Sequence, residues 1–217
     1  MRTASLSLLT ILCLMIAAAP AMADQILYDN GPINGTTNAW TINSGFAVSD
    51  SFTLNDFFTY YWFVNDLYFG VWLVQGDTVT SVQMDIGTSP FGTNVLSVVR
   101  NPTGSTDLGI NQYGYDIQQI ELPLFGEEML PGTYWLTLSN GTTPNGDPIY
   151  WDENSGIGCQ SYGCPSSAYQ TDTGSIPSEA FTISGYGQYF TPEPSSIMLF
   201  GSGILGLAGV LRRKLNI

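Results

Sequence analysis

The sequence predicts an all-β protein built around a single β-sandwich domain, jelly-roll-like rather than a closed barrel. Gly, Pro, Asn and Asp residues interrupt the segment from Asp24 to Phe190 at short intervals, which indicates many short strands joined by turns. Polar and apolar residues alternate with a period of two in Ser51–Leu54 and Thr133–Leu138, as expected of half-buried strands. Outside the two ends of the chain, no window shows a sustained 3.6-residue apolar repeat.

Residues 24–190 are expected to form one domain, because they contain neither a linker nor an internal repeat. A hydrophobic fraction of 44% supplies enough apolar material for a core. The predicted strands, in chain order, are Gln25–Tyr28, Ala39–Thr41, Phe46–Leu54, Leu67–Val74, Ser81–Gly87, Val95–Arg100, Gln118–Leu124, Thr133–Ser139, Ile149–Trp151 and Ala180–Ser184.

The first 23 residues have the pattern of a secretory signal peptide helix. Arg2 precedes the apolar run Leu6–Ala19, and small residues follow at Ala21 and Ala23. We expect cleavage after Ala23, during export through the inner membrane. An uncleaved N-terminal anchor is the alternative, but the apolar run is too short to span a bilayer comfortably.

The last segment, residues 191–217, predicts a short transmembrane helix over 195–211. Its apolar part, Ile197–Leu211, is 15 residues long, or 17 with the two preceding serines. Such a helix is about 23–26 Å long, against a hydrocarbon core of about 30 Å. The basic cluster after it places that end in the cytoplasm and the acidic domain outside. The flanking residues are Pro192, Glu193 and Pro194 before the helix and Arg212, Arg213 and Lys214 after it.

Pro192–Pro194, the Gly-rich and Leu-rich helix and the basic end together resemble the PEP-CTERM sorting signal. The resemblance implies recognition by an exosortase, removal of the helix, and delivery to the cell surface or the extracellular matrix, often in association with exopolysaccharide. An ordinary C-terminal anchor is the alternative. Phrases of the middle segment resemble the uncharacterised β-sandwich ectodomains found before this signal, which implies a fold and a location but no catalytic residues. They are Tyr28–Gly31, Phe69–Trp72, Ile86–Ser89, Gly132–Leu136 and Tyr150–Glu153.

Charge and composition exclude several classes of function. The formal charge is −13, and residues 24–190 alone carry seventeen acids against one base, Arg100. Nucleic acid is therefore not expected as a partner. Without histidine, the chain has no Ser-His-Asp triad, Cys-His pair or HExxH metal site. We expect a protein that is not an enzyme; a carbohydrate hydrolase would need a cleft with two suitably spaced carboxylates.

Cys159 and Cys164 are expected to form a disulfide, because Cys13 leaves with the signal peptide and exported proteins reach an oxidising compartment. A zinc site or a redox pair is the alternative. Two thiolates without histidine make a poor zinc site, and redox pairs usually have CxxC spacing.

No cofactor is expected except Ca²⁺, for which Asp147, Asp152 and Glu153, with Asn145 and Asn154 nearby, offer oxygen ligands. Their spacing does not match an EF-hand loop. The alternative is that they are turn residues, chosen for their backbone geometry.

Aromatic residues supply candidates for ligand binding. The segment Phe57–Phe63 is dense in aromatic side chains, and on a strand its neighbours must point to opposite faces. At least one of Tyr60, Tyr61 and Trp62 is then exposed and available to a sugar. We expect Trp72, Trp135 and Trp151 to belong to the core instead.

Two hypotheses of function follow. The first is an exported structural or adhesive surface protein, associated with exopolysaccharide or biofilm. The second is a carbohydrate-binding module that uses exposed aromatic residues, assisted by Ca²⁺.

Overall fold

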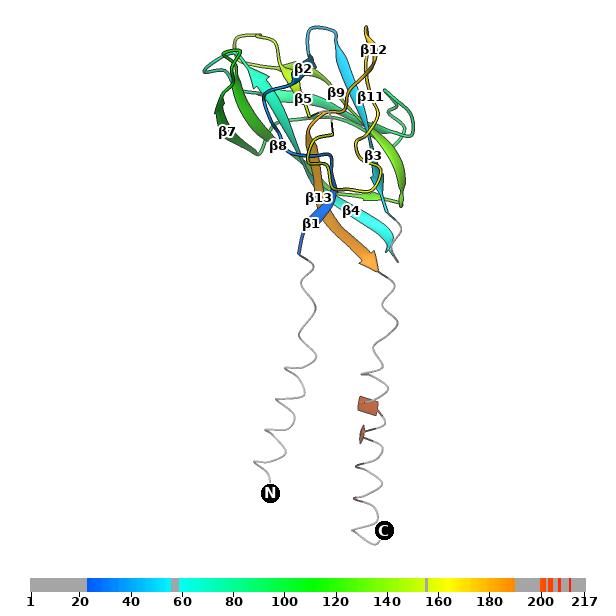
Figure 1. Ribbon diagram of the computed structural model, residues 1–217. Helices are drawn as coiled ribbons and strands as arrows, with labels where there is room; N and C mark the ends of the chain where they lie inside the picture. Colours follow the sequence, from blue (N-terminus) through cyan, green and yellow to red (C-terminus); the bar gives the residue numbers. More distant parts are fainter. Residues whose placement is uncertain are drawn as a thin grey trace, which may run out of the picture.

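The computed structural model describes residues 23–55, 59–154 and 156–189, together with Phe200, Gly201, Gly203, Ile204, Leu207 and Leu211. The described chain forms two antiparallel sheets that pack face to face around one apolar core (Figure 1). The expected all-β sandwich is therefore confirmed. The expected signal peptide helix lies outside the described residues. Those described between 200 and 211 have helical backbone, and in the described parts of the chain no helix has the length and hydropathy to cross a membrane.

The larger sheet, sheet A, is organised around one long strand, β4 (Thr59–Leu73). β8 (Asp116–Met129) pairs with one edge of β4 and carries β7 (Gly104–Ile110) at its outer side. β13 and β10 pair with different lengths of the other edge. The remaining strands of sheet A are β1 (Gln25–Asp29), β2 (Asn38–Thr41), β10 (Tyr150–Glu153) and β13 (Phe181–Tyr189).

The smaller sheet, sheet B, has the strand order β12-β11-β3-β9-β5-β6. Most consecutive strands of the chain lie in opposite sheets, so the polypeptide repeatedly crosses from one layer to the other. The bounds of these strands are β3 (Ala47–Leu54), β5 (Ser81–Gly87), β6 (Leu96–Arg100), β9 (Gly132–Thr142), β11 (Ala168–Gln170) and β12 (Gly174–Ile176).

All ten predicted strands are present, but three further strands were missed: β7, β11 and β12. β7 has the sequence GSTDLGI and is exposed along most of its length, so it shows no apolar alternation. β11 and β12 are only three residues long each, which is too short for a periodic signal.

A β-bulge in β4 reverses which residues face the core. Before it Trp62 and Val64 are buried, and after it the buried set is Leu67, Phe69, Val71 and Leu73. The register with β13 shifts between Val64 and Asp66, because β4 has one extra residue there opposite the consecutive residues Ser184 and Gly185. This extra residue keeps a fifteen-residue strand buried on one side although its sequence does not alternate throughout.

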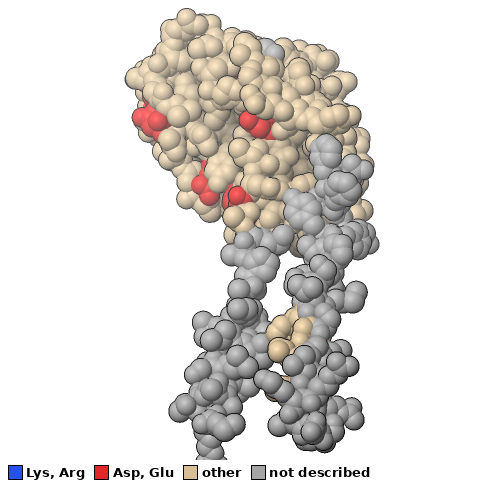
Figure 2. Space-filling view, turned by 60° about the horizontal axis from the view of Figure 1, so that its bottom comes forward, with Lys and Arg blue, Asp and Glu red and all other residues tan. Residues whose placement is uncertain are grey.

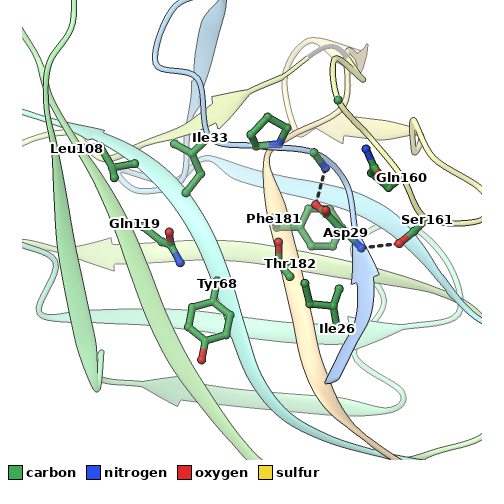
Figure 3. Close-up of a pocket in the computed structure, with 13 residues that line it drawn as sticks. Ile26, Asp29, Ile33, Tyr68, Leu108, Gln119, Gln160, Ser161, Phe181 and Thr182 are labelled. Atoms are coloured by element: carbon green, nitrogen blue, oxygen red, sulfur yellow. Dashed lines mark hydrogen bonds between the residues drawn. The ribbon is translucent and has the colours of Figure 1, made fainter. Parts of the chain in front are cut away.

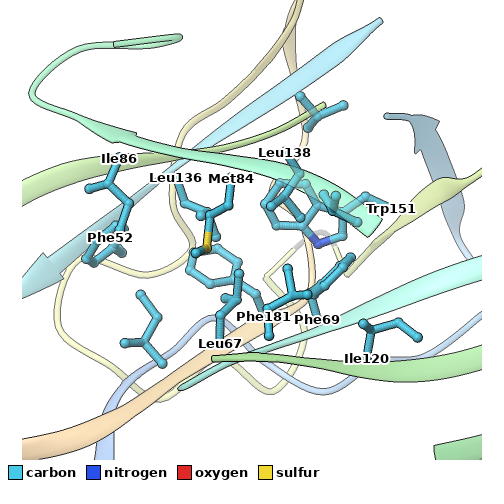
Figure 4. Packing of buried hydrophobic residues seen from close by; sticks show 14 of the residues in the cluster. Phe52, Leu67, Phe69, Met84, Ile86, Ile120, Leu136, Leu138, Trp151 and Phe181 are labelled. Carbon is cyan, nitrogen blue, oxygen red and sulfur yellow. The ribbon is translucent and has the colours of Figure 1, made fainter. Parts of the chain in front are cut away.

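The core is rich in aromatic rings (Figure 4). Trp151 is fully buried, meets Phe69 and Phe181 edge to face, and donates its Nε1–H to the carbonyl oxygen of Ala180 at 3.0 Å. Buried indole rings are stable when their single donor is satisfied in this way. The expectation that these tryptophans belong to the core is confirmed for Trp151 alone: Trp72 is buried but is not part of the core cluster, and Trp135 is only half-buried.

The first and last described strands lie together. β1 pairs with β13 in antiparallel register, Gln25 opposite Gly185, so the start of β1 and the end of β13 are at the same end of the sandwich (Figure 1). β2 and β7 lie toward the opposite end.

Candidate functional site

A hollow of about 770 Å³ lies on the outer face of sheet A (Figure 3). Its floor is formed by Tyr68 on β4, Gln119 on β8 and Thr182 on β13, three neighbouring strands. Ile33 and Leu108 bound one side, and residues 158–161, which include Gln160, bound the other. The floor offers one aromatic ring and two hydrogen-bonding side chains on a largely apolar surface.

The loop after β1 forms one wall of this hollow, and sheet A fixes its position. Ile33 packs over Gly70 so closely that a Cβ atom at Gly70 would lie 2.6 Å from Cγ2 of Ile33. The N–H groups of Asn34 and Gly35 donate to the carboxylate of Asp152 at 2.8 and 3.1 Å. The loop is therefore held in two ways. Gly70 has no side chain that would push Ile33 away, and the carboxylate of Asp152 accepts the N–H groups of Asn34 and Gly35.

Asp152 also orients the neighbouring aromatic side chain. Nε1–H of Trp72 donates to Oδ1 of Asp152 at 2.6 Å. Burial raises the pKa of Asp152, although the hydrogen bonds from Trp72, Asn34 and Gly35 oppose this effect by favouring the charged form.

A second hollow, of about 390 Å³, has aromatic walls. The ring of Tyr113 stacks on Trp72 with centroids 5.5 Å apart and planes inclined by 22°, while Tyr115 lies 6.0 Å from Trp72 and meets Tyr150 edge to face. Tyr113 is 55% exposed, so its ring is open to solvent. Thr37, Asn38 and Ala39 complete the lining. We call this the aromatic hollow.

The turn between β7 and β8 places the tyrosines of the aromatic hollow. Oδ1 of Asn111 accepts the N–H groups of Tyr113 and Tyr115, both at 3.0 Å, and the Gly114 N–H donates to the carbonyl oxygen of Asn111. Gly114 has a φ of 85°, which a residue without Cβ adopts at low cost. A single asparagine thus closes the turn and aims both rings at Trp72.

A third hollow, of about 400 Å³, lies between the two. It shares Ile33 and Leu108 with the first hollow. It meets the aromatic hollow at the consecutive residues Thr36 and Thr37, and again at residues 112 and 113. Together the three form a row along the outer face of sheet A, which we call the outer groove.

Tyr60, Tyr61 and Trp62, the aromatic residues proposed from the sequence to bind a ligand, do not share one environment in the structure. Trp62 is 8% exposed, packs in the core and donates its Nε1–H to the carbonyl oxygen of Asn55 at 2.8 Å, so its ring is not at the surface. Tyr61 points to the other side of β4 and is half-buried. The side chain of Tyr60 lies outside the described set. Neither Tyr61 nor Trp62 lines the outer groove.

The three predicted calcium ligands do not form a common cluster: in the described parts of the chain, no group of three or more Asp, Glu, Cys or His side chains is arranged to hold a metal ion. Asp152 lies beneath the outer groove, as described above. Glu153 accepts the Nε1–H of Trp40 at 3.1 Å, and Asp147 belongs to a turn closed by Thr143. Calcium binding by these residues stays a prediction.

The C-terminal end of the chain matches a known protein family model. The family model described as the PEP-CTERM protein-sorting motif matches residues 190–214. The chain carries a PEP-CTERM sorting motif. The resemblance expected from the sequence is therefore confirmed, and the motif implies an exported protein that exosortase directs to the surface or the exterior of the cell. Among curated proteins, no sequence matches this chain.

The sandwich ends where the matched motif begins. β13 runs to Tyr189, and the match starts at residue 190. The six motif residues identified from the sequence lie outside the described residues: Pro192, Glu193, Pro194, Arg212, Arg213 and Lys214.

The predicted disulfide is confirmed. Cys159 and Cys164 are bonded, with Cα atoms 5.9 Å apart, and they close a small loop between β10 and β11. Oγ of Ser161 in this loop accepts the N–H of Asp29 at 2.7 Å (Figure 3). The disulfide therefore fixes one side of the outer groove.

On one face of the domain the exposed acidic side chains lie apart from one another (Figure 2). Figure 2 shows them as separate spots on a face that is otherwise uncharged, with no Lys or Arg among the described residues in view. A large negative charge spread in this way repels anionic polymers without creating a local cation site.

Proposed function

We propose that this chain is an exported, exosortase-processed surface or matrix protein with a structural or adhesive role, and that its sandwich domain holds an uncharged polysaccharide in the outer groove. The sorting motif supports the first part of the proposal. Residues 1–23 would direct export, and the helix over 195–211 would cross the inner membrane until exosortase removes it.

The aromatic hollow carries the second part. The stacked pair of Trp72 and Tyr113 presents an open ring face of the kind that packs against the C–H face of a sugar. Asn38 and the hydroxyl of Tyr150 add hydrogen-bonding groups beside it. Burial raises the pKa of Tyr150, and the neighbouring Tyr115 adds to this effect.

The row of hollows favours a polymer over a monosaccharide. The three hollows follow one another from the aromatic hollow to Tyr68 and Gln160, so they offer several separate places for the units of a sugar chain. An uncharged chain suits it best, because the domain carries seventeen acids and one base.

The lining of the aromatic hollow favours binding over hydrolysis. It consists of Thr, Asn, Ala, Trp and Tyr side chains, and none of these described residues bears a carboxylate. A glycosidase needs two carboxylates facing its substrate. This lining supports a role that is not enzymatic.

The binding proposal is tested with Tyr113→Ala and Tyr162→Ala. Both tyrosines are exposed, by 55% and 70%, but only Tyr113 lines the groove. On a glycan array probed with the full-length chain in detergent, we expect retention of a neutral glucan, mannan or galactan by the parent and by Tyr162→Ala. Tyr113→Ala should lose about two- to twelvefold in affinity, since stacking on an aromatic ring contributes about 0.5–1.5 kcal/mol. Equal retention by both variants would remove this site.

The sorting proposal is tested separately, by blotting surface and medium fractions of cells with and without exosortase. We expect a shorter, external form that requires both the enzyme and intact Pro192–Pro194. An unprocessed protein in the inner membrane of both strains would disprove the sorting claim without bearing on sugar binding.

A further inference from the structure

The core of the sandwich contains an acidic residue at a position where an apolar side chain is expected. Along β3, the residues that point between the sheets are Val48, Asp50, Phe52 and Leu54, and Asp50 has no exposed surface. An isolated carboxylate at such a position costs several kcal/mol unless something compensates its charge.

A second acid reaches the same place from the other sheet. Glu179 precedes β13, lies opposite Glu153 in an antiparallel bridge, and is also fully buried. Its backbone N–H donates to Oδ2 of Asp50 at 2.7 Å, so the two residues are in direct contact across the layers.

Three of the four carboxylate oxygens of this pair have no hydrogen-bond partner among the described residues. They are Oδ1 of Asp50 and both Oε atoms of Glu179. Buried polar atoms are almost always paired, so these three acceptors require a proton, a donor or a cation to satisfy them.

Neutral oxygen-bearing groups surround the pair. Nδ2 of Asn30 lies 3.4 Å from Oδ2 of Asp50 and donates to Oγ of Ser166 at 2.6 Å. The hydroxyl of Tyr28 donates to Oδ1 of Asn30 at 3.1 Å. Ser166 follows the loop closed by the disulfide, and its N–H also binds Asn30, so this loop covers the acidic pair.

No basic side chain of the described chain compensates these charges. Arg100 is the only Lys or Arg between residues 23 and 189; its Nε–H donates to the carbonyl oxygen of Pro123, and its guanidinium lies over the ring of Phe125. Burial raises the pKa of Asp50 to about 7 and raises that of Glu179 well above its usual value, with the charge of Asp50 adding to the effect. Near neutral pH, the pair must therefore hold protons or a bound cation.

We propose that a calcium ion binds between Asp50 and Glu179, inside the sandwich, and completes the core of the folded protein. The ionisable side chains of the pair are carboxylates, whose oxygens suit hard cations better than metals that prefer nitrogen or sulfur. Ca²⁺ accepts six to eight oxygens in irregular geometry, including amide, hydroxyl and carbonyl oxygens and water, whereas Mg²⁺ requires a near-ideal octahedron. Two carboxylates and neutral oxygens are typical of extracellular modules, whose Kd values are about 10⁻⁴–10⁻³ M.

The test uses the full-length chain in detergent, after EDTA treatment and removal of the chelator. We expect saturating Ca²⁺ to raise the Tm by roughly 5–10 °C, and Mg²⁺ to raise it much less. Asp50→Asn and Glu179→Gln should abolish the calcium shift. Asp172→Asn removes the same charge from an exposed position and should retain the shift in full.

A second measurement covers variants that fail to fold. Tb³⁺ bound between the acids should be excited through Tyr28 and displaced by Ca²⁺ in the parent chain. Glu179→Asp keeps the charge but withdraws the carboxylate by one methylene, and should weaken calcium binding tenfold or more. A Tm that calcium leaves unchanged, or a shift that survives in Asp50→Asn and Glu179→Gln, would overturn the proposal. The outcome does not depend on whether the outer groove binds sugar.

Discussion

The backbone N–H of Glu179 donates to the carboxylate of Asp50 at 2.7 Å, and this contact joins the two sheets through two fully buried acids. A sandwich core is normally sealed by apolar side chains from both layers. Here it is closed at one point by a polar cluster, and that cluster lies beneath the loop that also borders the outer groove.

The buried acids predict an unusual dependence of stability on pH. The pKa of Asp50 is about 7 in the folded chain and about 3.8 in a free side chain, so the folded state binds more protons between these values. The free energy of unfolding of the calcium-free protein should therefore fall as the pH rises from about 4 to about 7. Glu179, with its raised pKa, should extend the decline. Hydrogen bonds from Ser166 and from the backbone of Glu179 and Ser51 oppose the rise in the pKa of Asp50, whereas the charges of Glu153 and Asp152 add to the rise at Glu179.

Urea titrations in EDTA across pH 4–8 measure this slope, and calcium should flatten it by compensating the charged form. The control is Asp50→Asn, in which much of the slope should disappear while the repulsion among surface acids persists. A parent protein that gains stability in EDTA over this range would contradict the raised pKa values.

We predict that loss of the disulfide weakens the polar cluster around Asp50 and Glu179. Replacing Cys159 and Cys164 together by Ser should lower the free energy of unfolding by about 2 kcal/mol, since the loop is small. Because Ser166 follows that loop and binds Asn30, calcium should also bind more weakly. Thermal melts with and without calcium check both effects. A double variant with the calcium shift of the parent would show that the loop does not cover the ion.

We predict that a side chain at position 70 would disturb the outer groove, because it would collide with Ile33. A Cβ atom there would meet Ile33 at 2.6 Å and displace the loop between the hollows. Gly70→Ala should cost about 1–3 kcal/mol and lower glycan affinity. In Gly132→Ala the new Cβ finds Tyr134 no closer than 3.6 Å, so this variant serves as the control. Affinity measured at 10 °C, where both variants are folded, separates the loss of binding from the loss of stability.

We predict that the aromatic hollow depends on the turn between β7 and β8 that Asn111 closes. Asn111→Ala removes the acceptor for the N–H groups of Tyr113 and Tyr115, so the tyrosines should lose their fixed orientation. Glycan affinity should fall several-fold, while the Tm should change by only a few degrees because the turn is at the surface. Asn145→Ala, in the exposed turn before β10, should leave both unchanged. Unaltered binding by Asn111→Ala would show that the rings are placed by their own stacking.

The sequence predicted the elements whose signal is local. Alternation around Trp135 and Phe52 identified β9 and β3, and the CxxxxC spacing in an exported chain identified the disulfide. The fully buried Trp151 followed from a large ring in a strand. These features depend on neighbouring residues and on side-chain chemistry alone.

The features that could not be predicted from the sequence depend on contacts between segments that are distant in the chain. Trp62 was expected among exposed candidates, but the phase of β4 before its bulge turns the ring into the core. Tyr113 and Trp72 are 41 positions apart in the sequence and meet only when β7 and β8 fold back on β4. Asp50 and Glu179 look like ordinary surface acids, since only the pairing of the two sheets shows that they are buried.

The antiparallel pairing of β13 with β4 determines how the domain bears force. Tyr189, the last residue of β13, lies opposite Thr59, whereas Trp72 is near the other end of β4, roughly 40 Å away. A polymer that pulls on the aromatic hollow, while the chain after Tyr189 is held, stretches these two strands lengthwise past each other. Their ladder of hydrogen bonds lies across that direction and must break all at once rather than one bond at a time. The arrangement is that of a mechanical clamp, suited to a protein that resists flow between a surface and the material attached to it.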